Sequence, residues 1–133
     1  MASKGRPYRT VEVEGWEVLV GRGARENDRL TFEVAAPADL WLHVAGYTGS
    51  HVVVRNPDEL PQDAVPRAVV RLAAELAAWH SKARGARGKV EVHVCRAGDV
   101  KKPRGWPAGQ VQLRRWESLE VYPKGGNRGD ELR

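Results

Sequence analysis

Two histidines flank a short glycine-containing loop in the segment DLWLHVAGYTGSHVVVR, which runs from Asp39 to Arg55. Histidine titrates near neutral pH, so His43 and His51 could act as an acid–base pair, with Asp39 as a third group. They could instead contact a ligand without reacting with it. The apolar runs on both sides of the loop predict strands that hold it at each end, and a loop held in this way commonly carries function.

A second polar loop, KKPRGWPAG, covers residues 101–109 and places three cations beside a tryptophan. Trp106 lies between Gly105 and Pro107, where a place in the core is difficult to arrange. We expect the cations to neutralise phosphates and Trp106 to contact the partner by stacking on a base. The two loops together predict one surface that binds a nucleic acid.

The positive charge of the chain is concentrated in one region. The net charge is +5, yet residues 82–115 contain ten Lys and Arg against two acids, while the remaining residues contain 12 basic and 15 acidic side chains. A regional excess favours an electrostatic contact with a polyanion such as nucleic acid. The alternative is a solvated basic face that binds nucleic acid weakly and without specificity.

Other kinds of chemical site are not supported by the spacing of the residues. No His, Cys or acidic cluster around the two loop histidines has zinc-ligand spacing, so we expect no metal. His93 and Cys95 share one strand face, but two ligands do not make a metal site. Ser50 lacks the surrounding pattern of a nucleophile elbow, and the glycines form no phosphate-binding loop. We therefore expect neither a catalytic nucleophile nor a bound cofactor.

The length of 133 residues fits one domain with a real core. The single cysteine excludes an internal disulfide, and no apolar run approaches the roughly 20 residues that span a membrane. The basic start of the chain, MASKGRPYR, lacks the apolar region of a signal peptide. We expect a cytoplasmic protein with no membrane partner, and the sequence leaves its oligomeric state open.

The elements that must position the two loops are those of an α+β fold. We expect a single domain in which a mostly antiparallel sheet packs against one long helix plus a short helix. Alternating apolar residues predict strands at Thr10–Val13, Trp16–Val20, Lys89–Cys95, Gln110–Arg115 and Ser118–Tyr122, and the two short apolar runs predict strands at Leu40–Val44 and Val52–Val54. The domain should cover residues 10–122, between a flexible N-terminus (1–9) and a flexible C-terminal tail (123–133).

The long helix is predicted by an apolar stripe whose members recur at spacings of three or four, namely Val65, Val69, Leu72, Leu76, Trp79 and Ala83. We expect Asp63 in its first turn, where the helix dipole favours negative charge, and we expect Gly85 to end it. Trp41 and Trp79 are expected to lie in the core rather than to contact a ligand.

Two local features are predicted around the first loop. Asn27 or Asp28 should cap a short helix that runs through Leu30–Val34, because their side chains accept hydrogen bonds from free helical N–H groups. Gly49 should adopt a positive φ in the turn before the second strand, because glycine has no Cβ to oppose it.

Four segments of the chain resemble one known family. They are VGRGARENDRLTF (20–32), DLWLHVAGYTGSHVVVR (39–55), LAAWHSKAR (76–84) and VKKPRGWPAGQV (100–111). In this order, over about residues 10–122, they look like the NFACT-R domain (NFACT RNA-binding domain, DUF814). The resemblance implies an RNA-binding module of proteins that act in ribosome-associated quality control and bind the large ribosomal subunit and tRNA. The chain has no room for the other parts of those proteins, so we expect a standalone version.

The resemblance also implies functional positions. The family pattern maps onto Arg22, Asn27, Asp28, Asp39, Trp41, His43, Gly49, Ser50, His51, Ser81, Lys101, Lys102, Pro103 and Gly109. With the charge and the two loops, it leads us to expect RNA contacts from Arg22, His43, Ser50, His51, Arg55, Lys82, Arg84, Lys101, Lys102, Arg104 and Trp106. A structural role is expected for Asn27, Asp28, Asp39, Trp41, Gly49 and Gly109.

The function expected from these observations is non-catalytic binding of structured RNA, either tRNA or rRNA, in ribosome-associated quality control or tRNA metabolism. One alternative is an enzyme that processes or modifies RNA with His43 and His51 as acid–base groups. Another is a protein-interaction module that docks on the large ribosomal subunit.

Overall fold

The computed structural model describes residues 6–124, so parts of both predicted tails, residues 1–5 and 125–133, lie outside the described residues. Within this range, six strands form one antiparallel sheet in the order β1-β2-β4-β3-β5-β8, and β6 and β7 form a separate pair. The strands are β1 (Tyr8–Val13), β2 (Trp16–Gly21), β3 (Leu40–Val44), β4 (Val52–Val54), β5 (Val90–Arg96), β6 (Val100–Lys101), β7 (Gln112–Leu113) and β8 (Glu117–Val121). The helical elements are α1 (Ala24–Arg29), the π-helix η2 (Leu30–Val34), α2 (Arg67–Trp79), and the 3-10 turns η3 (Gln62–Ala64) and η4 (Ala97–Asp99).

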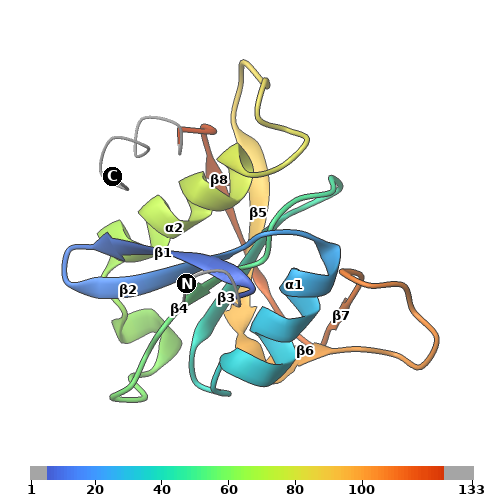
Figure 1. The fold of residues 1–133 in the computed structure, drawn as a ribbon. Coiled ribbons are helices and arrows are strands. Elements are labelled where there is room, and N and C mark those ends of the chain that lie inside the picture. The colour runs from blue at the N-terminus through green and yellow to red at the C-terminus, as the bar shows by residue number, and fades with distance from the viewer. Residues whose placement is uncertain (1–5, 125–133) are drawn as a thin grey trace.

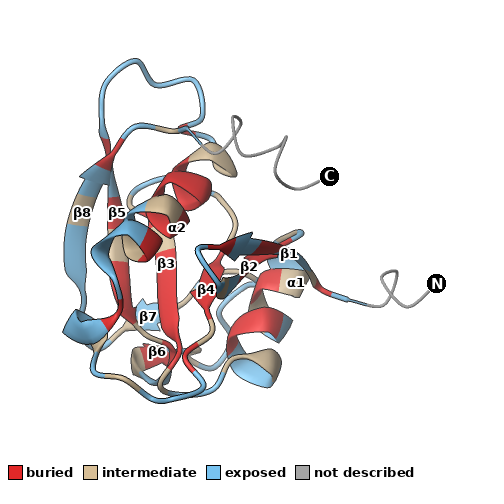
Figure 2. Ribbon diagram, turned by 90° about the vertical axis from the view of Figure 1, so that its left-hand side faces the viewer, coloured by how far each residue is buried: buried red, intermediate tan, exposed pale blue. Residues whose placement is uncertain are grey.

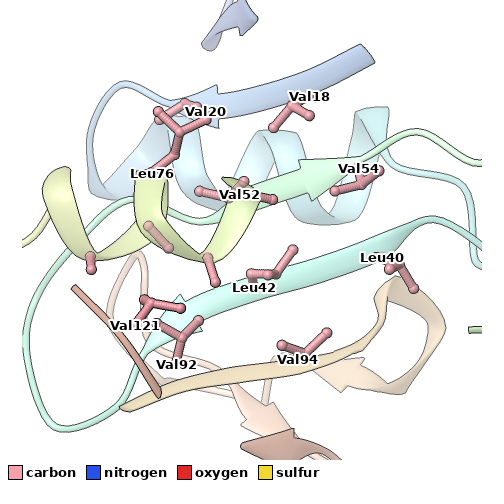
Figure 3. Close-up of a cluster of buried hydrophobic side chains, with 14 of the residues drawn as sticks. Val18, Val20, Leu40, Leu42, Val52, Val54, Leu76, Val92, Val94 and Val121 are labelled. Atoms are coloured by element: carbon pink, nitrogen blue, oxygen red, sulfur yellow. The ribbon is translucent and has the colours of Figure 1, made fainter. Parts of the chain in front are cut away.

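The two faces of the sheet bury different sets of side chains, because successive residues of a strand point to opposite sides. In β3, Leu40 and Leu42 face α2 and join the larger apolar cluster, whereas Trp41 joins a smaller cluster on the other face. The larger cluster, drawn in Figure 3, combines valines and leucines of the central strands with the inner side of α2. The smaller cluster packs the sheet against η2 and β6 through Leu30 and Val100.

The sheet is thus covered on both faces, by α2 on one and by the α1–η2 segment with the β6–β7 pair on the other (Figure 1). Figure 2 shows that β3 and β4 are buried along almost their whole length, whereas β8 at the edge is largely exposed. The predicted α+β class with a mostly antiparallel sheet is confirmed. No helix among residues 6–124 has the length and apolarity needed to cross a bilayer.

The long helix is shorter than predicted. It begins after Pro66 and ends at Trp79 rather than at Gly85, and Asp63 lies before it in η3. The cause is a non-local pairing: the Ser50 N–H donates to the His80 carbonyl at 2.8 Å, so the chain leaves the helix to run beside the first loop. Ala83 is buried although it lies beyond the helix.

Two other expectations about local structure were wrong. Asn27 and Asp28 are not caps, because both lie inside α1, and their side chains reach other loops instead. The strand predicted at Gln110–Arg115 is reduced to the two residues of β7. The other predicted strands agree with the structure to within two residues at each end.

Candidate nucleic-acid interface

An open groove of about 920 Å³ is formed where four segments meet. These are the chain between β2 and α1, the loop between β3 and β4 (residues 45–51, the 45–51 loop), the residues that follow α2, and the loop at residues 102–110 (the 102–110 loop). Seven of the side chains predicted to contact RNA line it, namely Arg22, His43, Ser50, His51, Lys82, Arg84 and Trp106. The structure therefore brings together residues that are far apart in the sequence.

Asn27, on the side of α1 that faces the sheet, positions the 45–51 loop. Its buried side chain donates to the Gly49 carbonyl at 3.2 Å and accepts from the His51 N–H at 3.0 Å. The Ser50 hydroxyl donates to the Gly21 carbonyl at 2.7 Å, which ties the same loop to the end of β2. Ser50 therefore has a structural hydrogen bond in addition to its place at the groove.

Gly49 is required for a different reason from the one predicted. It does not have a positive φ; in this loop the positive φ of 78° belongs to Gly46. A Cβ atom on Gly49 would lie 2.5 Å from the Cβ of Ser81, because these two residues form an isolated β-bridge. The glycine therefore permits close approach of two chain segments rather than an unusual turn.

The 102–110 loop is folded around the ammonium group of Lys102. This group donates to the Gln110 carbonyl at 2.7 Å and to the Pro107 carbonyl, and it pairs with the Asp28 carboxylate at 3.1 Å. The same carboxylate accepts from the Gly109 N–H at 3.0 Å. Lys102, expected as an exposed RNA contact, thus has a structural role, and Asp28 attaches the loop to α1.

His51 is a second attachment point for this loop, and this residue is only 1% exposed. One ring nitrogen, Nε2, lies 3.1 Å from the Gly109 carbonyl, which can only accept, so Nε2 carries the proton. The other, Nδ1, then accepts from the Thr31 hydroxyl at 2.8 Å, and that hydroxyl accepts from the indole N–H of Trp41 at 3.0 Å. This placement contradicts the expected direct RNA contact by the ring. Trp41 lies in the core as predicted.

The two loop histidines are neutral at physiological pH. Burial lowers the pKa of His51 to about 3 and that of His43 to about 4, from an ordinary value of 6.5. Proximity of each ring to another histidine lowers both pKa values further. A general acid or base works best with a pKa near the operating pH, so these environments do not favour proton transfer.

Asp39 does not belong to the same site as the histidines. It lies at the opposite end of β3 from His43, about 13 Å away for four strand residues. Its carboxylate accepts from the Ala36 and Asn56 N–H groups at 2.9 and 2.8 Å and pairs with Arg55 at 2.9 Å. The expected acid–base trio is therefore not assembled. Arg55, expected at the RNA surface, stabilises this distant turn instead.

Four cations line the groove, and Arg9 of β1 was not predicted among them. The others are Arg22, Lys82 and Arg84. All four are exposed, and none takes part in the ion pairs found within residues 6–124. Arg9 could not be singled out from the sequence, because it reaches the groove only through the pairing order of the sheet.

The guanidinium of Arg84 is held in place by Trp79. It lies 4.2 Å from the centre of the indole ring, and its Nε donates to the Trp79 carbonyl at 2.8 Å. Trp79 was expected in the core but is half-buried and lines the groove. The neighbouring His80 has its pKa lowered to about 4, first by burial and then by the positive charges of Arg9 and Arg84.

Two aromatic side chains line the groove and remain open to solvent. Tyr47 is 49% exposed and Trp106 is 42% exposed. Tyr47 is part of the predicted loop but was not proposed as a contact, although an aromatic residue in a polar loop is a usable signal. The predicted cations Lys101 and Arg104 are exposed but do not line the groove.

The chain is similar to several known proteins. A family model described as "NFACT protein RNA binding domain" matches residues 6–115. The chain is 38% identical over 123 residues to a protein named Rqc2 homolog RqcH of Streptococcus suis (strain 05ZYH33), a match that covers 89% of the chain and 20% of the relative. The protein of the same name from Bacillus subtilis (strain 168) is 35% identical over 127 residues, with 90% and 21% covered.

A solved structure with the same fold is titled the C-terminal of the fibronectin/fibrinogen-binding protein from Streptococcus suis. It superposes with a TM-score of 0.82 at 35% identity and covers 95% of this chain and 49% of that one. The chain spans about one fifth of the length of the curated relatives that it matches. Since the family model matches most of its length, the chain belongs to the NFACT RNA-binding domain family.

Proposed function

We propose that this domain binds structured RNA, a tRNA or an rRNA, through the groove and without catalysing a reaction on it. The observation that carries the proposal is the combination of four exposed cations outside any described ion pair with two exposed aromatic rings around one groove. Cations neutralise phosphates and release counterions, while aromatic rings stack on bases that are not paired. Together these side chains fit an RNA, which offers both phosphates and bases, better than an acidic protein surface, which offers only negative charge.

The histidines support a binding role over a catalytic one. The His51 ring is enclosed by the Thr31 hydroxyl and the Gly109 carbonyl, so both of its nitrogens are already in use. His43 is half-buried, with its pKa lowered to about 4 by burial, and no carboxylate of residues 6–124 pairs with it. An enzyme that uses this pair as acid and base would need groups that titrate closer to neutral pH.

The two curated relatives described above are both named Rqc2 homolog. We therefore propose that the RNA contact serves ribosome-associated quality control in the cytoplasm and that it brings the domain to the large ribosomal subunit. In this role the domain supplies affinity and orientation, and any further activity depends on other chains or segments.

Salt-dependent RNA titration tests the proposal. The variant Arg22→Gln with Lys82→Gln removes two groove cations, and Arg29→Gln with Arg67→Gln removes the same charge from exposed positions outside the groove. We expect the groove variant to reduce the slope of log affinity against log salt by about 0.7 per lost contact, and the control to leave it nearly unchanged. Equal effects of the two variants would contradict binding in the groove.

A further inference from the structure

Three cation–π contacts occur in the described part of the chain, and all three involve the connection between α2 and β5 or the end of β8 beside it. In the first, the guanidinium of Arg84 lies 4.2 Å from the centre of the Trp79 ring. In the other two, the ammonium groups of Lys89 and Lys124 lie 5.7 and 5.8 Å from the centre of the Tyr122 ring. An aromatic ring attracts a cation but carries no net charge, so each cation keeps its full charge for a ligand.

The register of the sheet brings Lys89, Tyr122 and Lys124 together, and we call these three residues the Tyr122 cluster. β5 and β8 are antiparallel neighbours in which Val90 pairs with Val121, so Lys89, before Val90, comes opposite Tyr122, after Val121. All three residues of the cluster are exposed, and Tyr122 is 41% exposed. Two positive charges held near one ring repel each other, so the arrangement favours the binding of an anion.

The segment at residues 82–89 (the 82–89 segment) connects the Tyr122 cluster to the groove. Its sequence, KARGARGK, contains four cations and no acid. Its first two cations, Lys82 and Arg84, line the groove, and every residue of the segment except Ala83 is exposed. The segment projects from the body of the domain between α2 and β5 (Figure 1). Positive charge therefore continues along the chain from the groove to the cluster.

Carboxylates do not neutralise this charge. None of the ion pairs in the described part of the chain involves a cation of the 82–89 segment or of the Tyr122 cluster. The carboxylate of Glu91, the acid that follows the segment, accepts from the Ser118 hydroxyl and lies 3.4 Å from Nε2 of His93. Glu120, at the end of β8, pairs with neither lysine of the cluster. The segment and the cluster thus keep a net positive charge that a polyanion can neutralise.

We propose that the backbone of a bound RNA continues from the groove along the 82–89 segment to the Tyr122 cluster, where its phosphates contact Lys89 and Lys124. This inference rests on the proposed function and extends the RNA-binding surface beyond the groove. Tyr122 positions the two ammonium groups. Continuity with a groove that carries exposed aromatic rings favours RNA over an acidic protein segment, because RNA offers bases as well as phosphates.

The first test is a salt-dependent titration with an RNA hairpin whose stem has about 15 base pairs, close to the length that one double-strand-binding module spans. Lys89→Gln with Lys124→Gln should reduce the slope of log affinity against log salt by about 0.7 per lost contact and weaken binding roughly tenfold at about 0.1 M salt. The control Arg29→Gln with Arg67→Gln removes the same charge elsewhere and should change both quantities little.

The second test asks whether one RNA covers both surfaces. The Lys89–Lys124 variant is combined with the groove variant Arg22→Gln and Lys82→Gln, and the reduction in slope should be about the sum of the two separate reductions. Titration at protein concentrations well above the dissociation constant should show one hairpin per domain. Additive losses at this stoichiometry are expected only when the same RNA contacts the groove and the cluster.

The positioning role of Tyr122 has its own pair of variants. Tyr122→Leu removes the ring but leaves both lysines, so part of the loss seen in the Lys89–Lys124 variant should appear. Tyr122→Phe keeps the ring and should bind RNA as the wild type does. Thermal melting confirms that each variant is folded, which is expected because the substituted side chains are exposed.

The outcomes separate this proposal from the proposed function. An effect of the Lys89–Lys124 variant no larger than that of its control would overturn the extended surface and leave RNA binding in the groove intact. Two hairpins per domain would also overturn it, since one backbone would then not cover both surfaces. If poly-glutamate binding, and not RNA binding, depends on the two lysines, the cluster serves an acidic protein and the proposal fails. Failure of the wild-type domain to bind the hairpin at all would overturn the proposed function itself.

Discussion

The 45–51 loop and the 102–110 loop both line the groove, and they are held there by different kinds of contact. The 45–51 loop is fixed by backbone pairing with residues 80–82 and by the buried amide of Asn27. The 102–110 loop is fixed by the partly exposed pair of Asp28 and Lys102, by the hydrogen bond from the Gly109 N–H to Asp28 and by one hydrogen bond from His51. Close packing and buried hydrogen bonds resist change more strongly than a partly solvated ion pair does. We therefore predict that a change in the contacts of the 45–51 loop destabilises the whole fold. A change in the contacts of the 102–110 loop should instead open that loop while the rest of the domain stays folded.

Gly49→Val should have the largest effect on stability. The new side chain would meet the Ser81 Cβ at 2.5 Å and its Cα at 3.0 Å, and the backbone of a β-bridge cannot move aside. We expect a loss of about 3 kcal/mol in the free energy of unfolding, measured by denaturant titration. Gly49→Ala combined with Ser81→Gly removes the nearest clash and should recover part of the loss that Gly49→Ala causes alone. No recovery would show that the contact with Ser81 is not the cause.

Asn27→Ala should have the second largest effect on stability. It leaves the Gly49 carbonyl and the His51 N–H without their partner in a buried place. We expect a cost of about 2–3 kcal/mol, because each buried unpaired backbone group costs about 1–3 kcal/mol and water can satisfy part of it. Asn27→Asp keeps the acceptor but not the donor and should fall between wild type and Asn27→Ala. A stability equal to that of wild type would refute the role of this amide.

The protein should become less stable at mildly acidic pH, because the folded state keeps His51 in its neutral form. The pKa of His51 is lowered from 6.5 to about 3, so between these values the unfolded chain binds a proton that the folded chain does not. Stability is therefore highest above pH 6.5 and falls as the pH decreases toward 3. From pH 7 to pH 5 this one group should contribute a loss of about 2 kcal/mol.

His51→Gln separates this contribution from those of His43 and His80. Glutamine can still donate to the Gly109 carbonyl but does not titrate. Unfolding curves at pH 7, 6 and 5 should show a smaller loss for the variant than for wild type, even though the variant is less stable at pH 7. Parallel losses in the two proteins would contradict a buried neutral His51.

Lys102→Met should have the smallest effect on global stability and a clear effect on one loop. The side chain is 25% exposed and gathers the loop carbonyls toward Asp28, so we expect a loss of about 1 kcal/mol. Trypsin should cleave after Arg104 several-fold faster in this variant, because the 102–110 loop opens without global unfolding. Lys101→Met, at an exposed neighbour, is the control and should change stability by less than about 0.5 kcal/mol.

Most of the fold could be predicted from the sequence, because its strands and helices are indicated by patterns among neighbouring residues. The short apolar runs Leu40–Val44 and Val52–Val54 correctly indicated strands. The end of α2 was not predictable, since the apolar stripe continues to Ala83 and only the distant Ser50 and Gly49 stop the helix after Trp79.

The residues of the candidate site were predictable in part for the same reason. Lys82, Arg84 and Trp106 were identified from charge and from loop composition, and all three line the groove. His51 was misjudged because a histidine at the edge of a polar loop indicates exposure, whereas its hydrogen bonds to residues of two other elements allow it to be buried. Arg9 was missed because no local pattern distinguishes it from other strand cations.

The attachments of the 102–110 loop also bear on the order in which the chain folds. They join residues that are 58, 74 and 81 positions apart in the sequence: His51 with Gly109, Lys102 with Asp28, and Gly109 with Asp28. Contacts between such distant residues close long loops and form late, after nearer pairings have limited the chain. The groove should therefore be among the last parts of the molecule to form, and a chain that stalls before completing its fold would expose its strands without acquiring the ability to bind.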